Sequence, residues 1–562
     1  MEIYEFDCCV KLLQVNFKGF SMALYKSGAA VAPHFQAAQV ACGILKEGGN
    51  AIEAMVAAAA AIAVVYPHMT AIGGDAFWLI HESGKNAPRA LDACGRSFSG
   101  ATMERYKEAS LEAVPTRGVY AANTVAGTVS GWQAALELSQ HLGGKLPLSA
   151  LLEPAINLAA TGITVTQSQY AATTSKQAEL STQVGFSDAF LVGKNGEKVP
   201  PKTGERFVMP RLAGTLEQLS RAGLGDFYTG DISVSIANDF AKIGGLLTRQ
   251  DLLVHRAKLV DPLQIALSRT AARATIFNLP PPTQGVISLL ILAIVERVFE
   301  KHGLTRFKSD NADTIHVVVE ATKLAFGVRD KYITDPLYMQ IAAPHLLEND
   351  VVSTLAAKIK LDAAAPWGKK SNPGDTVWMG AIDSKGCAVS FIQSIYHEFG
   401  SGIVLPETGI NWQNRGASFS MDPKSILRLA PDKQPFHTLN PALAHFKDGS
   451  VMPYGTMGGD GQPQTQAAIF LRITYFGLHP QDAIAAPRWL LGRSWGKLSD
   501  SLKIEKRYSQ EVFDSLVARG HDVEWLGDFD ESVGHAGALI AHANGTISGG
   551  FDPRSDGAVV GF

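Results

Sequence analysis

The segment "NPGDTVWMGAIDSKGCAVSFIQS", residues 372–394, changes from a polar, turn-prone stretch into an almost wholly apolar one. Residues 376–382 and 387–394 predict two strands joined by a turn at 383–386, an antiparallel hairpin. Thr376 stands where the loop becomes the first strand. Threonine favours strands because its side chain is β-branched. The alternative is that the chain is cut before Thr376, which would then be a new N-terminus and a nucleophile.

The chemistry of a terminal threonine supports this alternative. A hydroxyl is a weak nucleophile unless a base takes its proton, and the base can be the residue's own α-amino group once the preceding bond is cut. An α-amino group has a pKa of about 7.7–8.0, so it accepts a proton near neutral pH. The loop before Thr376, residues 360–375, is rich in Pro, Gly and Lys and is the natural place for a cut.

Two further segments could carry chemistry. In "YGTMGGDGQPQ", residues 454–464, Gly458 and Gly459 lie between a predicted strand and a predicted helix. The backbone N–H groups of such a turn can hold an oxyanion or a phosphate, and a plain tight loop is the alternative. The segment 395–420 places polar side chains around glycine-rich bends, namely Tyr396, His397, Asn414 and Arg415. Neither the histidines nor the cysteines have the spacing of metal ligands, so we expect no metal and no cofactor.

Composition limits the class of protein. The chain has 562 residues, of which 46% are apolar, and a net charge of -3 without long runs of one sign. This argues against a nucleic-acid or membrane partner. The five cysteines form no framework, which indicates a reducing compartment. The N-terminus lacks the features of a signal peptide. The apolar runs 54–66 and 286–295 are too short to cross a bilayer of ~30 Å and predict buried helices. We therefore expect a cytoplasmic protein.

The remaining sequence predicts an α+β protein. Residues 34–68 predict two helices interrupted at Gly48-Gly49-Asn50, and residues 73–97 predict a strand, a turn and a strand. Residues 128–303 are mainly helical with strand-like interruptions, and 313–332 predict a long helix. After Thr376 the chain is strand-rich, with hairpins at 442–459 and 537–553 and two helices, at 465–478 and 509–523.

Several motifs in order resemble one family. They are "GGNAIEAMVAAAAAIAVVYPHMTAIGGDAFWLI", "GTVSGW", "PPPTQG", "GDTVWMGAIDSKGCAVSFIQS", "FGSGIVLPETGI", "GTMGGDGQPQ", "APRW" and "DPRSDG". From about residue 32 to 562 the chain resembles the γ-glutamyltransferase family of N-terminal-nucleophile (Ntn) hydrolases. The resemblance implies a four-layer αββα sandwich, autocatalytic cleavage at Asp375–Thr376, Thr376 as nucleophile, Gly458 and Gly459 as the oxyanion site, and Ser394 as a hydroxyl near the nucleophile.

The same resemblance implies a domain plan. Residues 1–30 would be an N-terminal extension, 31–375 the mainly helical large subunit and 376–562 the small subunit, intertwined in one structural domain. The oligomeric state stays open, with a homodimer of such pairs as the candidate.

The chain departs from the family pattern in the substrate pocket. Cys94 and Gly95 stand where true γ-glutamyl enzymes carry an Arg-Glu pair, and Arg96 is displaced by two positions. The acidic pair that holds the glutamyl amine is replaced by "NRGAS", which contains Arg415. His437 and Thr438 replace a serine pair, and Val377 and Trp378 replace a threonine and a histidine. This pattern is more similar to the branch that contains oxamate amidohydrolase.

Three functions follow from these comparisons of motif. The first is hydrolysis of a small, carboxylate-bearing amide, with Arg96, Arg415 and His437 facing the substrate. The second is a γ-glutamyltransferase or glutathione hydrolase with an altered pocket. The third is a non-catalytic relative that binds a partner. The residues expected to line the substrate site are Arg96, Tyr396, His397, Asn414, Arg415, His437 and Thr438.

Overall fold

The structure is a computed structural model that describes residues 23–267, 273–368, 374–492 and 499–562. Most of the predicted extension, residues 1–22, lies outside the described residues. The residues that follow lie against the other end of the chain. Tyr25 bridges to Ile547, and the backbone N–H groups of Lys26 and Ser27 donate to the carbonyl of Phe562.

The first two helices are those predicted. They are α1 (Phe35–Lys46) and α2 (Ala51–Val65), separated by the Gly48-Gly49-Asn50 turn. The Asn50 side chain accepts from the N–H of Glu53, and the Glu53 carboxylate accepts from the N–H of Asn50. This capping box satisfies N–H groups that a helix leaves without partners at its start. All of α2 is buried.

A seven-stranded antiparallel sheet contains the predicted Thr376 hairpin. Its order is β20-β1-β11-β12-β2-β3-β8. The strands are β20 (Ala558–Gly561), β1 (Ala29–Ala32), β11 (Asp375–Ile382), β12 (Ala388–Tyr396), β2 (Asp75–His81), β3 (Arg89–Ala93) and β8 (Lys258–Val260). Strands from before and after Thr376 are therefore mixed within one sheet: β1 lies between β20 and β11, and β2 pairs with β12.

A six-stranded antiparallel sheet contains the other two predicted hairpins, β13–β14 and β18–β19. Its order is β19-β18-β14-β13-β10-β9. The strands are β19 (Ile547–Phe551), β18 (Ala536–Ala541), β14 (Val451–Thr456), β13 (Ala442–Phe446), β10 (Ala274–Asn278) and β9 (Leu263–Leu267). Strands β9 and β10 again come from the part of the chain that precedes Thr376.

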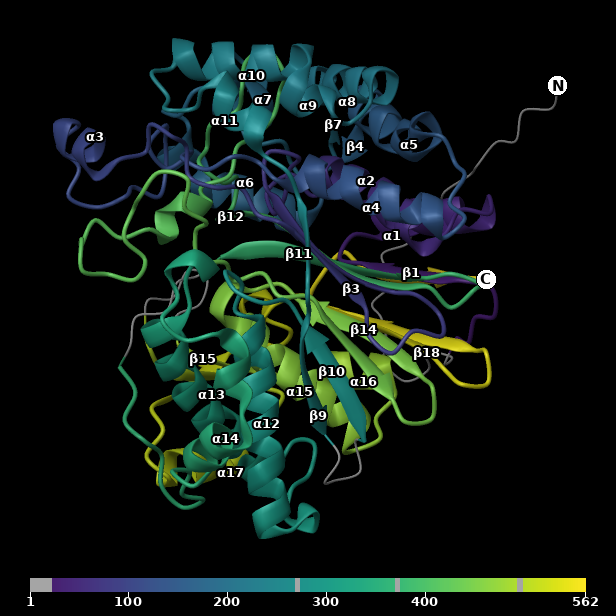
Figure 1. The fold of residues 1–562 in the computed structure, drawn as a ribbon, viewed down its shortest axis with the longest axis vertical. Helices are drawn as coiled ribbons and strands as arrows, with labels where there is room; N and C mark the ends of the chain where they lie inside the picture. Colours follow the sequence, from purple (N-terminus) through teal and green to yellow (C-terminus); the bar gives the residue numbers. More distant parts are fainter. Residues whose placement is uncertain (1–22, 268–272, 369–373, 493–498) are drawn as a thin grey trace.

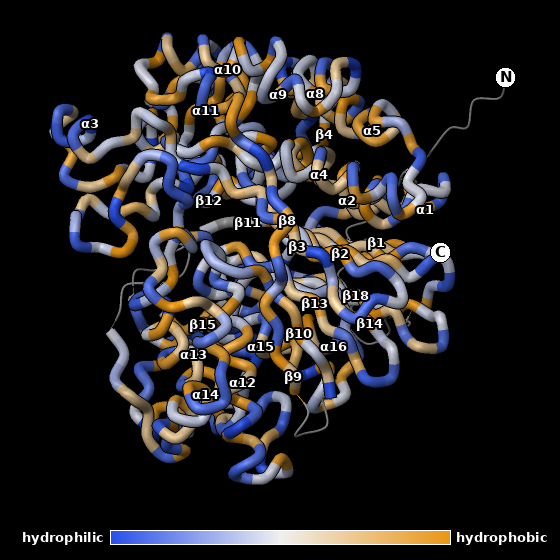
Figure 2. The backbone as a smooth tube through the Cα atoms, viewed as in Figure 1, coloured by the Kyte–Doolittle hydropathy of each residue, from blue (hydrophilic) through white to orange (hydrophobic). Residues whose placement is uncertain are grey.

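The two sheets face each other between two groups of helices (Figure 1). One group lies on the β11 side: α1, α2, α3 (Met103–Glu108), α4 (Thr128–His141), α5 (Leu148–Thr161), α6 (Gln167–Leu180), α7 (Phe186–Phe190), α8 (Pro210–Ala222), α9 (Asp226–Thr229), α10 (Asp231–Lys242) and α11 (Arg249–Val254). The other group lies on the β14 side: α12 (Gly285–His302), α13 (Ala312–Tyr332), α14 (Asn349–Ala356), α15 (Gln462–Thr474), α16 (Pro480–Ala485) and α17 (Gln510–Ala518). Hydrophobic segments concentrate in the strands and the helices on them, whereas peripheral segments such as α3 are hydrophilic (Figure 2).

Trp378 fills the space between the two sheets at the start of β11. A Cβ at Gly455 of β14 would lie 2.3 Å from the Trp378 ring, and one at Gly537 of β18 would lie 2.5 Å from it. Both positions must therefore be glycine, because real Cβ atoms do not approach other atoms so closely. The Trp378 Nε1 donates to Ser390 Oγ at 2.9 Å. The tryptophan thus brings the start of β11 against the end of β14.

The sequence prediction missed several short elements. A three-stranded sheet of β15 (Trp489–Leu491), β16 (Leu502–Glu505) and β17 (Val523–Leu526) was not predicted. Both helices predicted after Thr376 are present, as α15 and α17, but the short helix α16 between them was not predicted. These elements have three to six residues, too few for a hydrophobic period to emerge. No helix in the described part of the chain is long and apolar enough to cross a membrane. The apolar runs predicted as buried helices are α2 and α12.

Candidate active site

Thr376 lies at an irregularity between β11 and β12. Asp375 pairs with Tyr396 and Val377 pairs with Gln393, so a single residue, Thr376, faces two residues of β12. Tyr396 has a φ of 81°, a left-handed conformation that is uncommon for a bulky side chain. Thr376 is 1% exposed. Bulges and strained residues of this kind re-aim side chains at functional sites, so Thr376 is more than a regular strand residue.

Arg415 packs against Tyr396. Its guanidinium carbon lies 3.4 Å from the centre of the Tyr396 ring. Its Nη1 donates to the Phe436 carbonyl at 3.1 Å, and its Nη2 donates to Thr438 Oγ1 at 3.3 Å. The side chain is 1% exposed, and burial lowers its pKa, although an arginine remains charged. Within the described ranges no carboxylate forms an ion pair with Arg415, and its Nε has no hydrogen-bond partner. Arg415 is thus a buried cation that forms no ion pair in the described residues, and the Asp75 and Asp460 carboxylates act on it only at longer range.

The Gly458-Gly459 turn joins the same group of residues. It follows β14 and precedes α15, and both glycines have positive φ, 116° and 52°. The Gln284 Nε2 donates to the Gly459 carbonyl at 2.9 Å and to the Thr438 carbonyl at 2.8 Å. The turn is therefore tied through Thr438 to Arg415. The N–H groups of Gly458 and Gly459 donate to no acceptor among the described residues, which leaves two donors for a ligand.

A buried Asp75–His437 pair lies beside this group. Asp75 begins β2 and pairs across the sheet with Ser394. Its Oδ2 accepts from His437 Nε2 at 2.8 Å, and its Oδ1 accepts from Gln413 Nε2 at 3.1 Å. The backbone N–H groups of residues 95 and 127 also donate to Oδ1, at 2.9 and 3.1 Å. The carboxylate is thus saturated with donors and holds the His437 ring in place.

Burial sets the charge state of this pair. It raises the pKa of Asp75 to about 6, against hydrogen bonds that act in the opposite direction. It lowers the pKa of His437 well below its ordinary value, and the Arg415 cation adds to this. Near pH 7 Asp75 is therefore ionised and His437 neutral. The His437 proton must then lie on Nε2, which leaves Nδ1 as an acceptor without a partner in the described residues.

Two clusters have the composition of metal sites. The ligand atoms of Asp75, Cys94 and His437 lie within 4.8 Å of one another, as do those of a second cluster formed by His316, Glu320 and His521. In the first cluster, hydrogen bonds already occupy the carboxylate, and burial raises the pKa of the Cys94 thiol well above its ordinary value. In the second, a Lys323 ammonium lies 2.7 Å from the Glu320 carboxylate. A cation would have to displace these contacts.

Comparison with known proteins identifies the family. A family model described as gamma-glutamyltranspeptidase matches residues 37–562. The chain belongs to this family. The oxamate amidohydrolase proenzyme of Klebsiella pneumoniae is 53% identical over 95% of this chain and 98% of its own length. The glutathione hydrolase proenzyme of Escherichia coli is 28% identical over 96% of this chain and 92% of its own.

A solved structure agrees with the family. The cephalosporin acylase from Bacillus halodurans is 32% identical, with a TM-score of 0.86 over 100% of this chain and 99% of that one. The chain thus has the mixed α+β fold of the Ntn hydrolases, and it is a self-processing amidohydrolase of the gamma-glutamyltranspeptidase family. The predictions of family and of an enzyme are confirmed.

Other predicted site residues also lie near Tyr396. Ser394 Oγ accepts from the Tyr396 N–H at 2.8 Å, and the His397 ring lies 4.3 Å from the Tyr396 ring. Asn414 Oδ1 accepts from the His397 N–H at 3.1 Å, and its Nδ2 donates to the Thr116 carbonyl at 2.7 Å. The Asn414 amide is therefore used to hold the backbone around Tyr396.

Arg96 differs from Arg415. Its Nη1 lies 3.2 Å from Asp335 Oδ2, and its Nε lies 3.8 Å from Asp432 Oδ1. The Arg96 side chain is 22% exposed. Its charge is thus already compensated by two carboxylates, and its predicted contact with substrate stays a prediction.

Sequence reasoning named neither Asp75, Gln284 nor Arg329 as a site residue of this gamma-glutamyltranspeptidase-family enzyme. Arg329 Nη1 forms an ion pair with Asp460 Oδ1 at 2.8 Å, next to the glycine turn. Gln284 and Asp460 lie inside the "PPPTQG" and "GTMGGDGQPQ" motifs. The motifs therefore marked Gln284 and Asp460 as candidates, but only the long-range contacts in the structure show which groups their side chains bind.

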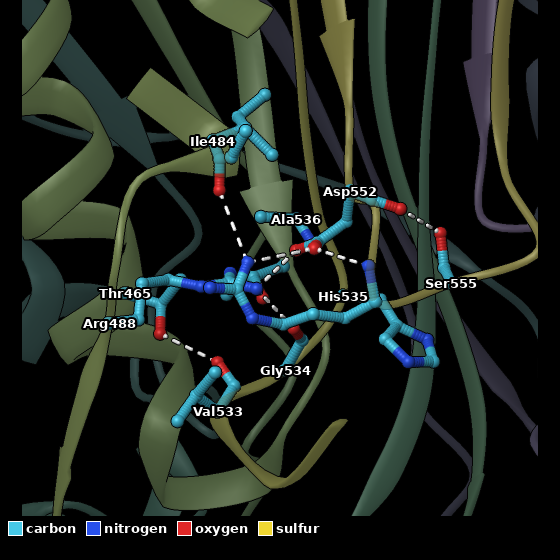
Figure 3. Close-up of polar contacts among 12 residues, drawn as sticks. Thr465, Ile484, Arg488, Val533, Gly534, His535, Ala536, Asp552 and Ser555 are labelled. Carbon is cyan, nitrogen blue, oxygen red and sulfur yellow. Dashed lines mark hydrogen bonds and ion pairs between the residues drawn. The ribbon is translucent and has the colours of Figure 1, made fainter. Parts of the chain in front are cut away.

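A second buried network surrounds Arg488, Gly534 and Asp552 (Figure 3). Arg488 pairs with Asp552, and its Nη2 donates to the Gly534 carbonyl at 2.7 Å. A Cβ at Gly458 would lie 3.5 Å from the Cα of Gly534. Arg554 extends the network, with ion pairs of 3.1 Å to Asp552 and 2.6 Å to Glu505. The "APRW" and "DPRSDG" motifs thus fix the segment behind the turn.

Proposed function

We propose that this enzyme cuts its own chain between Asp375 and Thr376 and then hydrolyses short amides with a carboxylate beside the scissile carbonyl, as in oxamate. The observation that carries the proposal is Arg415, a fully buried cation without a carboxylate partner in the described residues. The 53% identity to an oxamate amidohydrolase proenzyme supports it.

Self-cleavage starts with the Thr376 hydroxyl. Its oxygen attacks the carbonyl carbon of Asp375, and the bond from that carbon to the Thr376 nitrogen breaks, so that an amide becomes an ester. The nitrogen takes up the hydroxyl proton and becomes the free α-amino group of Thr376. Water then hydrolyses the ester, which frees the carboxyl of Asp375 and the hydroxyl of Thr376. The irregular pairing at Thr376 and the strained backbone of Tyr396 favour this shift. Fragments 1–375 and 376–562 would then hold the αββα sandwich together.

Amide hydrolysis follows in two steps. The α-amino group accepts the hydroxyl proton of Thr376 as the oxygen attacks the substrate carbonyl. The N–H groups of Gly458 and Gly459 stabilise the oxyanion, and the amine leaves with a proton. Water then hydrolyses the acyl-enzyme ester and restores the hydroxyl. Ser394, whose hydroxyl accepts from Tyr396, holds the backbone opposite the nucleophile.

Arg415 binds the substrate carboxylate in this proposal. A guanidinium offers two parallel N–H donors to a carboxylate, and such charge-assisted bonds are stronger than neutral ones. The Tyr396 ring and Thr438 fix its orientation. The Nδ1 of the neutral His437 has no hydrogen-bond partner in the described residues, and such an acceptor suits the N–H of a primary amide. A glutamyl ammonium would need an acidic partner, and the nearby Asp75 carboxylate is already saturated.

The test is a comparison of substrates and of two arginine variants. We expect kcat/KM for oxamate to exceed kcat/KM for γ-glutamyl anilide and for neutral amides. Arg415→Ala should lower kcat/KM for oxamate by about 10²-fold, chiefly through KM, because it removes a buried charged partner. Arg96→Ala is the control and should change KM by less than about threefold, because the Asp335 and Asp432 carboxylates already compensate its charge. A better γ-glutamyl substrate, or equal effects of the two variants, would overturn the pocket assignment.

A further inference from the structure

A side chain at the end of β14 holds the peptide group that leads into the Gly458-Gly459 turn. The hydroxyl of Thr456 donates to the Met457 carbonyl at 2.8 Å, and Thr456 is 0% exposed. No backbone N–H of the described residues donates to this carbonyl. The Thr456 hydroxyl therefore fixes an oxygen that the backbone hydrogen bonds leave free.

The Met457 carbonyl and the Gly458 N–H belong to one peptide group. A trans peptide is planar, and its C=O and N–H bonds point in opposite directions. A contact that fixes the carbonyl oxygen therefore also fixes the direction of the Gly458 N–H. A hydrogen bond to the carbonyl polarises the peptide as well, which makes its N–H a stronger donor.

Gly534 closes the space behind the same carbonyl. A Cβ at Gly534 would lie 2.4 Å from the Met457 oxygen and 2.8 Å from Thr456 Oγ1, so no larger residue fits there. Its φ of 89° also favours glycine. The Met457 carbonyl thus points toward Gly534. The Gly458 N–H, which has no acceptor among the described residues, points away from it.

The other proposed oxyanion donor, the Gly459 N–H, is fixed in the same way but by the backbone. It shares a peptide group with the Gly458 carbonyl, which accepts from the Gly461 N–H at 2.7 Å. Both donors of the turn are thus fixed through the carbonyl of their own peptide. A side chain does this only for the Gly458 N–H, so this is the donor that a single conservative substitution can release.

We propose that Thr456 is a positioning residue for the reaction, which aims the Gly458 N–H at the oxyanion through the Met457 carbonyl. The inference rests on the proposed oxyanion role of the Gly458-Gly459 turn. Threonine often bonds to nearby backbone, and a purely structural bond would stabilise the fold without affecting turnover. A positioned donor acts instead where charge develops in the transition state. Its loss therefore lowers kcat and leaves KM nearly unchanged.

The test is Thr456→Val, which keeps the branched shape of the side chain and removes the hydroxyl. Loss of a whole oxyanion donor costs on the order of 10²–10³-fold in turnover. For a donor that is only released we expect kcat of the matured enzyme to fall by at least about tenfold, with KM changed by less than about threefold. Thr456→Ser restores the hydroxyl and should keep kcat within about threefold of the wild type.

Thr465 provides a matched control (Figure 3). Its hydroxyl is also buried and donates to the Val533 carbonyl at 3.2 Å. The peptide group of that carbonyl carries the Gly534 N–H, which donates to the Glu531 carbonyl and not to a ligand. Thr465→Val should lower the melting temperature about as much as Thr456→Val, because each leaves one buried carbonyl without its donor. It should change kcat by less than about twofold.

All variants are measured with the amide that the wild type hydrolyses fastest, so the test does not require that oxamate is the substrate. Arg415→Ala is measured alongside them. If it leaves KM unchanged, the carboxylate pocket is wrong but the Thr456 comparison still stands. If Thr456→Val is not self-cleaved, Thr456→Cys replaces it and should lower kcat by several-fold, because a thiol is a weaker donor.

Three results would overturn the proposal. The first is an unchanged kcat in matured Thr456→Val, or in matured Thr456→Cys where that variant replaces it. The second is a Thr456→Ser enzyme as slow as Thr456→Val, which would mean that the shape of the side chain matters rather than its hydroxyl. The third is an equal fall of kcat in the Thr456→Val and Thr465→Val enzymes, which would mean that both hydroxyls act only through the stability of the fold.

Discussion

Two fully buried arginines, Arg415 and Arg488, are each connected to the Gly458-Gly459 turn and differ in their partners. Arg488 pairs with Asp552, which also pairs with Arg554. Arg415 has an aromatic ring and two neutral oxygens but no carboxylate among the described residues. A buried charge is costly unless it is compensated. The compensated arginine belongs to the framework, and the uncompensated one points to a ligand that supplies the missing charge.

The largest effect is expected from Thr376→Ala, which should abolish both self-cleavage and amidase activity. Without the hydroxyl neither self-cleavage nor acyl transfer can proceed. A denaturing gel of the wild type should show two fragments in roughly a two-to-one mass ratio, as the proposed cut after residue 375 of 562 implies, and the variant should show one band without amidase activity. An N-terminal sequence of the small fragment that starts anywhere but Thr376 would refute the assigned cut.

A substitution in the Gly458-Gly459 turn should have the next largest effect. Gly459→Pro removes one of the two backbone donors and also shifts the turn, because proline holds φ near −65° whereas φ at this position is 52°. Loss of one oxyanion donor lowers turnover on the order of 10²–10³-fold. We expect this loss in kcat, measured on protein that has matured and whose melting temperature is close to that of the wild type. Unchanged kcat in matured protein would place the oxyanion site elsewhere.

The two arginines themselves form a matched pair for stability. Arg488→Met leaves Asp552 with one cation instead of two and should destabilise the fold by about 3–5 kcal/mol. Arg415→Met removes an uncompensated charge and should change the free energy of unfolding by less than about 1 kcal/mol, while substrate affinity falls. Urea unfolding of both variants in the uncut Thr376→Ala chain measures the difference. Equal destabilisation by the two variants would show that Arg415 is a structural residue.

The smallest expected effect is a difference in pH dependence between Asp75 and Asp552. Burial raises the pKa of Asp75 to about 6, so its contribution to stability is present below about pH 4 and is lost as the pH rises through 6. For Asp552, burial is outweighed by Arg488 and Arg554 and the pKa is lowered, so its contribution is present above about pH 4 and is lost as the pH falls.

The pH prediction is measured with asparagine variants in the same uncut chain. The stability of the parent chain relative to Asp75→Asn should fall by up to ~3 kcal/mol between pH 4 and pH 7, the equivalent of about two pKa units. The stability of the parent chain relative to Asp552→Asn should instead fall as the pH drops below 4. Parallel pH profiles for the two variants would contradict these charge assignments.

Local patterns made much of the fold predictable. The Gly48-Gly49-Asn50 break, the hairpin at Thr376 and the hairpin at 537–553 all carry their signal within a few residues, and the structure has them as predicted. Strand β1 was missed because its sequence, "AAVA", is mostly alanine and is a strand only through its pairing with β11 and β20.

The site was predictable only in part. The positions of Thr376, Gly458 and Gly459 stand out as junctions between a loop or turn and a regular element. The role of Asp75 does not, because its donors come from residues 95, 127, 413 and 437, far apart in the sequence. For the same reason the sequence treated Arg96 and Arg415 alike, and only the neighbouring Asp335 and Asp432 distinguish them.

Both sheets combine strands from the two sides of Thr376, and this has a consequence for the enzyme after it is cut. Strand β11 lies between β1 and β12, so strands from the two sides of Thr376 are hydrogen-bonded neighbours. The uncut precursor assembles them within one chain, where closing even a long loop costs little entropy. Once cut, the two fragments would have to find each other by diffusion and thread their strands between one another. After complete denaturation, the cut enzyme should therefore regain activity far more slowly than the uncut precursor refolds. The half-life of the cut enzyme is then set by its rate of unfolding rather than by its equilibrium stability.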